Sequence, residues 1–373
     1  MSMTIGKRRS MVAAIACCLM LWAAAPASAA KDYVVEPVMS GLDHPWSLSF
    51  LPDGAMLVTG MKGKLWIVRD GKLSAPVSGV PAVSFAGQGG LFEALPHPNF
   101  AENRLVYLSY AAKGKDGKAL RVARARLDGG ALKDLTVIFE SEPGRSTSVH
   151  YGGRMAWLPD GTLVVTGGDG FNYREQAQNL ANHFGKIVRL NDDGTVPGDN
   201  PFVGRKGARP EIWSYGHRNA QGLVFDAATG RLYAHEHGPR GGDELNLIEK
   251  GANYGWPLAT KGMDYSGAYI TPFQTYKGTK DGITGWTPSI APCGLAIYHG
   301  AAFPRWDGDI FVGALAGRSL HRVDMQDGKV VGEETMLKDM NERIRDVRTG
   351  PDGLIYVLTD GGGAKLLRLK PSP

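Results

Sequence analysis

Short apolar runs separated by turns recur along the chain, and this repeat is the main structural signal in the sequence. Each unit has an apolar strand, a turn rich in Gly, Pro and Asp, and a second apolar strand, a pattern typical of β-hairpins. Six such units occur: Trp46–Val58, Gly90–Tyr110, Gly153–Val165, Gly222–Ala234, Gly294–Gly313 and Asp346–Thr359. Most are followed by a further candidate strand, as at Lys64–Val68, Ala119–Arg126, Lys186–Asn191 and Ser319–Asp324.

This repetition predicts an all-β fold, a six-bladed β-propeller with four-stranded antiparallel blades. We find no convincing amphipathic helix between the units, and their number disfavours the alternative of a two-sheet sandwich. The 51 glycines and 22 prolines indicate many turns. Pro-Asp-Gly at 52–54, 159–161 and 351–353 is expected at hairpin tips, because Pro presets φ and Gly accepts a positive φ.

The first 30 residues have the layout of a cleaved secretory signal peptide. A basic head at 7–9 precedes an apolar body at 11–26 and the small residues 27–30. A lipoprotein anchored through Cys17 is disfavoured, because cleavage there would leave most of the apolar body on the mature chain. We therefore expect a signal peptide over 1–30, a single propeller domain over 31–373 and a periplasmic location. Cys293 is then the one mature cysteine, and it cannot form an internal disulfide.

Charge and hydropathy narrow the range of partners. The formal net charge of +5 falls to about +2 once the three basic leader residues are removed (5 − 3). This balance offers no electrostatic case for nucleic acid or an anionic surface, and a small neutral partner fits better. No apolar run after the leader is long enough to span a membrane.

Unusual polar residues concentrate in the stretch from Ile212 to Pro257. Gly222–His235 is predicted to be a hairpin, and the Gly- and Pro-rich segment after it presents backbone carbonyls together with Asp243 and Glu244. Such oxygens are the ligands that calcium prefers, although an ordinary acidic loop explains this stretch equally well. His235 and His237 form a poor metal-binding pair, because the turn begins between them.

Residues just before the first strand of each blade are expected at the mouth of the central channel, where propellers bind ligands. Polar side chains occur at these positions: Gln88, His150, Arg218, Asn219, Arg343 and Arg345. The i, i+2 spacing of Arg343 and Arg345 predicts that both lie on one side of a strand leading into the channel.

The motifs in and around these positions resemble those of the soluble aldose sugar dehydrogenases that use pyrroloquinoline quinone, relatives of soluble glucose dehydrogenase. They are GLDHPWSLSFLPDG (41–54), GQGGLFEALPHPNF (87–100), HYGGRMAWLPDG (150–161), SYGHRNAQGL (214–223), EHGPRGGDELNLIEKGANYGWP (236–257) and RIRDVRTGPDG (343–353). They extend over nearly the whole mature chain in the family's order.

The resemblance implies oxidation of an aldose at C1 to the lactone, with hydride passing to the quinone and electrons then to an external acceptor. His150 matches the general base, and Asp169 matches the carboxylate that orients it. Four residues match cofactor contacts of the family: Arg218, Asn219, Arg343 and Arg345. Arginine suits such a position because its guanidinium pairs with the carboxylates of the quinone. Gln88 and Tyr265 match two further pocket positions.

The same resemblance implies two calcium sites. Gly238 and Pro239 match the positions whose backbone carbonyls hold the calcium that polarises the quinone carbonyl. Glu244 and Tyr254 match a second, structural calcium site, with the tyrosine acting through its backbone oxygen. A monomer or weak homodimer is expected.

Two departures from the family pattern bear on these expectations. Ala316 stands where family members often carry a lysine, with Arg318 as the nearest substitute, and Thr59-Gly60-Met61 lacks an expected Glu-Arg pair. Two alternatives to the dehydrogenase therefore remain: a calcium-dependent propeller lactonase, and a propeller that binds sugar without catalysis. A lactonase requires acidic side chains that converge on a channel calcium, whereas this chain directs arginines there.

Overall fold

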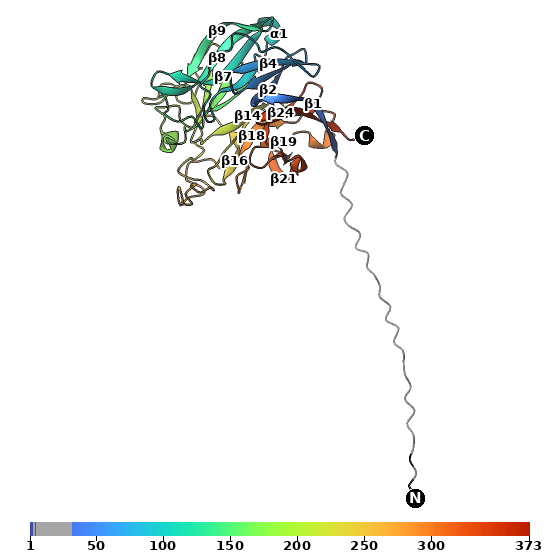
Figure 1. Cartoon of the computed structure of the whole chain (residues 1–373). Helices are drawn as coiled ribbons and strands as arrows, with labels where there is room; N and C mark the ends of the chain where they lie inside the picture. The colour runs from blue at the N-terminus through green and yellow to red at the C-terminus, as the bar shows by residue number, and fades with distance from the viewer. Residues whose placement is uncertain (3, 5–31) are drawn as a thin grey trace. The chain divides into compact units, whose positions relative to one another are not determined.

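The computed structural model describes residues 1, 2, 4 and 32–373 of the chain. All six predicted hairpins form within Tyr33–Pro373, and each belongs to a four-stranded antiparallel sheet (Figure 1), so the predicted six-bladed propeller is confirmed. Apart from residues 1, 2 and 4, the predicted signal peptide lies outside the described residues.

The strands follow the chain from sheet to sheet. The first two sheets contain β2 (Pro45–Phe50), β3 (Met56–Gly60), β4 (Lys64–Arg69) and β5 (Lys72–Leu73), then β6 (Leu91–Pro96), β7 (Leu105–Gly114), β8 (Gly117–Asp128) and β9 (Ala131–Glu140). The third and fourth contain β10 (Gly152–Trp157), β11 (Leu163–Gly167), β12 (Lys186–Leu190) and β13 (Ile212–Tyr215), then β14 (Ala220–Asp226), β15 (Arg231–Glu236), β16 (Asp243–Ile248) and β17 (Thr284–Trp286).

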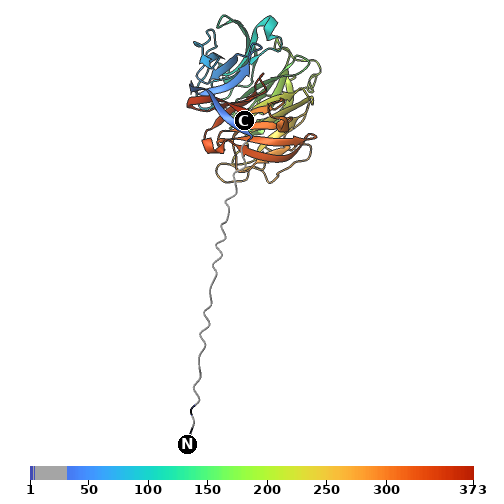
Figure 2. The same ribbon diagram turned by 90° about the vertical axis from the view of Figure 1, so that its right-hand side faces the viewer.

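The last two sheets close the ring. The fifth contains β18 (Pro292–Ile297), β19 (Ile310–Ala314), β20 (Ser319–Gln326) and β21 (Lys329–Met336); the sixth contains β22 (Ile344–Thr349), β23 (Ile355–Thr359), β24 (Gly362–Pro371) and β1 (Tyr33–Asp43). The N-terminal strand β1 therefore completes the C-terminal sheet by pairing with β24, and in Figures 1 and 2 the blue strand runs beside red ones. Helical structure within the described residues is limited to α1 (Phe100–Asn103) and the 3₁₀ turns Arg174–Gln178, Pro304–Trp306 and Lys338–Met340.

The innermost strands β2, β6, β10, β14, β18 and β22 contact one another in a closed ring. They are buried on both faces, as in β18, where every residue is buried, and their apolar side chains pack between neighbouring sheets. The apolar residues of each hairpin thus form the core between blades, which explains why the repeat is so clear in the sequence.

Each innermost strand has an irregular register near its start. Register shifts occur at Pro45/Ser47, Leu91/Ala94, Gly152/Met155, Ala220/Gly222, Cys293/Leu295 and Ile344/Asp346. Bulges of this kind redirect side chains beside binding sites. Here the shifts lie next to polar residues that were predicted at the channel mouth, such as Asn219 and Arg345.

Candidate functional site

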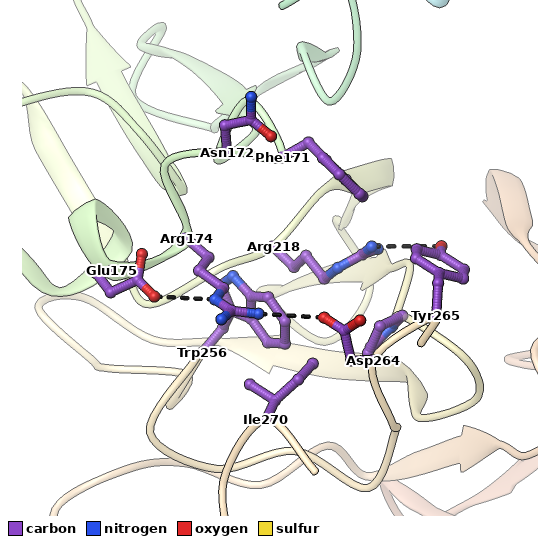
Figure 3. A pocket seen from close by; sticks show the side chains of 10 residues that line it. Phe171, Asn172, Arg174, Glu175, Arg218, Trp256, Asp264, Tyr265 and Ile270 are labelled. Carbon is purple, nitrogen blue, oxygen red and sulfur yellow. Dashed lines mark hydrogen bonds and ion pairs between the residues drawn. The ribbon is translucent and has the colours of Figure 1, made fainter. Parts of the chain in front are cut away.

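Two cavities lie where the innermost strands begin. The first, of about 250 Å³, is lined by residues from all six sheets or their connecting loops, including Gln88, Asn219, Arg343 and Arg345. The second, of about 310 Å³, is lined by the loop after β11 and by the long connection between β16 and β17, and it includes Arg218, Pro239 and Tyr265 (Figure 3). Five of the six predicted channel residues therefore divide between these two spaces. His150 is in neither lining, but its neighbour Tyr151 and its hydrogen-bond partner Gln88 line the 250 Å³ cavity.

His150 and Asp169 form a buried pair. His150 Nδ1 lies 2.7 Å from Asp169 Oδ1, and the side chains are 6% and 1% exposed. Asp169 also accepts hydrogen bonds from the Trp256 indole at Oδ2, 2.8 Å, and from the Phe171 backbone N–H at Oδ1, 2.8 Å. Because Nδ1 donates to the carboxylate, the lone pair of a neutral imidazole is at Nε2.

The backbone of His150 is held in an uncommon conformation. Its φ is 53°, in the left-handed region that non-glycine residues rarely occupy. Gln88 Oε1 accepts the His150 N–H at 2.8 Å, and Arg145 donates to the His150 carbonyl at 2.6 Å. Gln88 and Arg145 therefore hold the two peptide groups on either side of the His150 Cα, and so fix the position of the imidazole.

Burial and pairing set the charges of this pair. Burial lowers the pKa of His150, although the hydrogen bond to Asp169 opposes that effect. Burial alone would raise the pKa of Asp169, but the hydrogen bond to His150 and the charges of His150 and Arg218 lower it below its usual value. The arrangement is a neutral imidazole held by an ionised carboxylate, which is the state required of a general base.

The two arginines at the start of β22 meet a carboxylate that the sequence did not indicate. Arg343 Nε lies 2.8 Å from Asp360 Oδ2, and Arg345 contacts Asp360 Oδ1 through Nε and Nη2 at 2.9 and 2.6 Å. Asp360 follows β23 and lines the same 250 Å³ cavity. The predicted placement of both arginines on one side of the strand thus agrees with the geometry. Beside Ala316, the position that lacks the family's lysine, Leu315 lines the cavity. Arg318, the nearest substitute, instead donates a hydrogen bond to the Asn341 carbonyl.

Arg218 joins the two sides of the second cavity. Its Nη1 donates to the carbonyls of His237 and Gly238 at 3.0 and 2.7 Å, and Nη2 lies 3.4 Å from the Tyr265 hydroxyl. Figure 3 shows Arg218 facing Tyr265, and Arg174 between Glu175 and Asp264. Asn219 is directed elsewhere, because its Oδ1 accepts from the Gly152 N–H at 3.2 Å.

A third, small cavity of about 20 Å³ brings together Gly238, Glu244 and Tyr254, three of the four predicted metal-site residues. Pro239, the fourth, lines the 310 Å³ cavity beside it. Burial, followed by repulsion from Glu236, raises the pKa of Glu244 to about 8. Within the described residues the Glu244 carboxylate has no hydrogen bond or ion pair, so the donor set suits a hard cation that would neutralise it.

The sequence did not indicate a role for Trp256. This residue lies in the motif 236–257, but its indole contacts Asp169, which is 87 positions away in the chain.

His235 and His237 bond the carbonyls of Gly294 and Pro292, respectively, in agreement with the expectation that they are a poor metal pair. Burial lowers the pKa of His237 to about 3, so this ring is neutral.

The fold and the site together define a class of protein, the ligand-binding β-propellers with acid–base groups at the channel mouth. The defining features are a ring of six sheets, an arginine-lined central cavity and a buried histidine–carboxylate pair. Comparison with known proteins narrows this class. The family described as Glucose / Sorbosone dehydrogenase matches residues 42–368, and the chain belongs to this family. The resemblance inferred from the sequence motifs is therefore confirmed.

Individual relatives agree with this assignment. The chain is 45% identical over 358 residues to aldose sugar dehydrogenase YliI of Escherichia coli, covering 94% of this chain and 95% of that protein. The apo structure of the soluble aldose sugar dehydrogenase of Escherichia coli superposes with a TM-score of 0.88 at 43% identity, covering 91% of this chain and all of that one. The PQQ-bound form of the aldose sugar dehydrogenase of Streptomyces coelicolor gives a TM-score of 0.77 at 28% identity, covering 93% and 100%.

Proposed function

We propose that this protein oxidises aldose sugars at C1 to lactones, with pyrroloquinoline quinone and calcium as cofactors, and that it acts in the periplasm. The observation that carries the proposal is the buried His150–Asp169 pair beside an arginine-lined cavity. The PQQ-bound form of the Streptomyces coelicolor relative supports the choice of cofactor. The basic and apolar layout of residues 1–30 supports export.

The chain's residues fit the quinone. Its three carboxylates require cationic and amide donors, and the 250 Å³ cavity contains Arg343, Arg345, Asn219 and Gln88. When bound, the quinone supplies a two-electron acceptor and calcium polarises the accepting carbonyl. Gly238 and Pro239 would hold that calcium, and Glu244 with Tyr254 would hold a structural one.

His150 provides the acid–base step. Oxidation of an aldose removes the proton of the C1 hydroxyl together with a hydride from C1. His150 Nε2 accepts the proton, while Asp169 holds Nδ1–H and stabilises the imidazolium that forms. The Trp256 indole and the Phe171 N–H keep the carboxylate in place, so the base remains oriented between turnovers.

The charge of the central cavity favours this proposal over its alternatives. A lactonase requires converging carboxylates, but the carboxylate lining this cavity, Asp360, is engaged by Arg343 and Arg345. A cavity with paired arginines suits an anionic ligand better than a neutral sugar alone.

Reconstitution tests the proposal. Purified protein freed of metal and cofactor is assayed with glucose and a dye acceptor, before and after addition of pyrroloquinoline quinone and calcium. We expect dye reduction only after both are added, and a loss of about 10²-fold or more in His150→Ala. In a parallel arm, calcium raises the melting temperature of the protein but not that of Glu244→Gln. Absence of dye reduction with several aldoses, despite an intact fold, would refute the dehydrogenase.

A further inference from the structure

The charge balance of the 250 Å³ cavity is incomplete for an anionic ligand. Arg343 and Arg345 contribute two positive charges, and Asp360, in contact with both, offsets one of them. These three side chains therefore leave one net positive charge for a ligand that carries several carboxylates.

Five of the six nitrogens of the two guanidiniums already have a partner. Arg345 uses Nε and Nη2 for Asp360, and its Nη1 lies 3.6 Å from the Cys293 sulfur. Arg343 uses Nε for Asp360 and Nη1 for the Leu315 carbonyl at 3.3 Å. Within Tyr33–Pro373, Nη2 of Arg343 is the remaining nitrogen of the pair without a partner.

His44 lines the same cavity and is held there by its backbone. It connects β1 to β2 with φ 48°, in the left-handed region. Its N–H donates to the Gly361 carbonyl and its own carbonyl accepts from the Met61 N–H, both at 2.9 Å. These two backbone hydrogen bonds and the following Pro45 fix the position of His44 at the cavity wall.

Neighbouring charges orient the His44 ring. His44 Nδ1 lies 2.6 Å from Asp43 Oδ1, and Lys62 Nζ lies 3.1 Å from both Asp43 oxygens. The carboxylate is therefore shared between a lysine and the imidazole, and within the described residues His44 Nε2 has no hydrogen-bond partner. The charged groups around the ring are Asp43 and Lys62 on its own side, and Arg343, Arg345 and Asp360 among the other residues that line the cavity.

We propose that His44 is a cofactor-binding residue that donates from Nε2 to a carboxylate of the bound quinone while Asp43 holds Nδ1. This inference rests on the proposed function, since it takes the ligand to be a polycarboxylate. An imidazole that donates from both nitrogens is cationic. His44 thus supplies the positive charge that Asp360 removes from the arginine pair.

Calorimetric titration of the cofactor-free protein with pyrroloquinoline quinone tests this role without recourse to activity. The titration yields the Kd of the quinone. We expect His44→Gln to raise Kd by roughly ten- to a hundredfold, as for loss of one charge-assisted hydrogen bond. His44→Lys, which carries a permanent charge, retains binding.

The remote, surface-accessible His299 serves as the matched control, since His299→Gln should leave Kd unchanged. Thermal unfolding shows that each variant is folded. An unchanged Kd in His44→Gln would overturn the role of His44 while leaving the proposed function intact. Failure of the unaltered protein to bind the quinone would overturn both, so the two failures are distinguishable.

Discussion

Among single residues, Asp169 determines which nitrogen of His150 is available to a substrate. Its carboxylate receives hydrogen bonds from the imidazole, the Trp256 indole and the Phe171 backbone. An amide in its place can present its NH₂ group to Nδ1 and so favour the other tautomer. The base would then carry its proton on the nitrogen that should accept one.

We therefore predict that Asp169→Asn lowers kcat by about 10²–10⁴-fold while the fold is retained. Steady-state dye reduction with the reconstituted enzyme measures this effect. Asp327→Asn, at an exposed turn, is the control and should match the unaltered protein. Activity within threefold of the unaltered protein in Asp169→Asn would contradict the orienting role.

The pH dependence follows from the burial of His150. Burial lowers the pKa of this imidazole below its usual 6.5, and a base must be unprotonated to act. Activity should therefore persist as the pH falls past 6.5 and decline only at lower pH. The acid limb of kcat/KM for the reconstituted enzyme, which reports the free enzyme, measures this. A limb centred above pH 6.5 would exclude His150, as it lies in this structure, as the base.

At the scale of elements, the loop between β11 and β12 depends on Lys186. This loop, residues 168–185, carries Asp169 and the cavity residues Phe171 and Arg174. Lys186 is fully buried, and its ammonium donates to the carbonyls of Gln176, Ala177 and Phe184 at 3.0, 2.9 and 2.6 Å. These three hydrogen bonds thus hold the 3₁₀ turn Arg174–Gln178 against the start of β12.

Replacing this lysine should destabilise the protein and change its response to pH. Lys186→Met leaves three buried carbonyls without their donor, for a loss of about 1–3 kcal/mol in the free energy of unfolding near neutral pH. Burial lowers the pKa of Lys186 from 10.5 to about 7. Between these values the unfolded chain binds a proton that the folded protein has released, so this residue makes stability rise with pH, by at most about 1.4 kcal/mol per pH unit.

Urea unfolding at several pH values between neutrality and about pH 9 measures both effects. The unaltered protein should gain stability relative to Lys186→Met as the pH rises, whereas Lys329→Met, at an exposed position, should follow the unaltered protein. An unaltered protein and Lys186→Met that respond to pH in parallel would show that the buried ammonium does not titrate in this range.

For the propeller as a whole, closure depends on strand β1. This strand contributes the outer edge of a sheet whose other members, β22, β23 and β24, come from the end of the chain. Tyr33 and Leu42 of β1 are 5% and 1% exposed, and they pack in the cores of the fifth–sixth and sixth–first blade contacts, respectively. The ring is therefore closed by non-covalent pairing between the two ends of Tyr33–Pro373.

Deletion of β1 should weaken the whole ring. A chain that begins at Pro45 loses the burial of Tyr33 and Leu42, worth roughly 3–6 kcal/mol at about 1.5–3 kcal/mol for each side chain, and it exposes the edge of β24. Thermal unfolding of this chain, compared with one that begins at Lys31, measures the effect. Equal melting temperatures would show that β1 is dispensable for closure.

The sequence by itself determined the hairpins, their number and the identity of most polar residues at the channel mouth. It could do so because each hairpin's apolar spacing and turn chemistry are local, and because every innermost strand is buried in the same way. The motifs that preceded those strands were likewise local, so His150, Arg218 and Arg343 could be singled out from their positions alone.

Only the tertiary structure decided which of these residues meet, and what else they meet. Asp360 opposite the arginines, Trp256 on Asp169 and His44 at the cavity wall come from segments distant in the chain. The net charge of the site depends on groups that come together only when the ring closes. No local pattern in the sequence therefore predicts it.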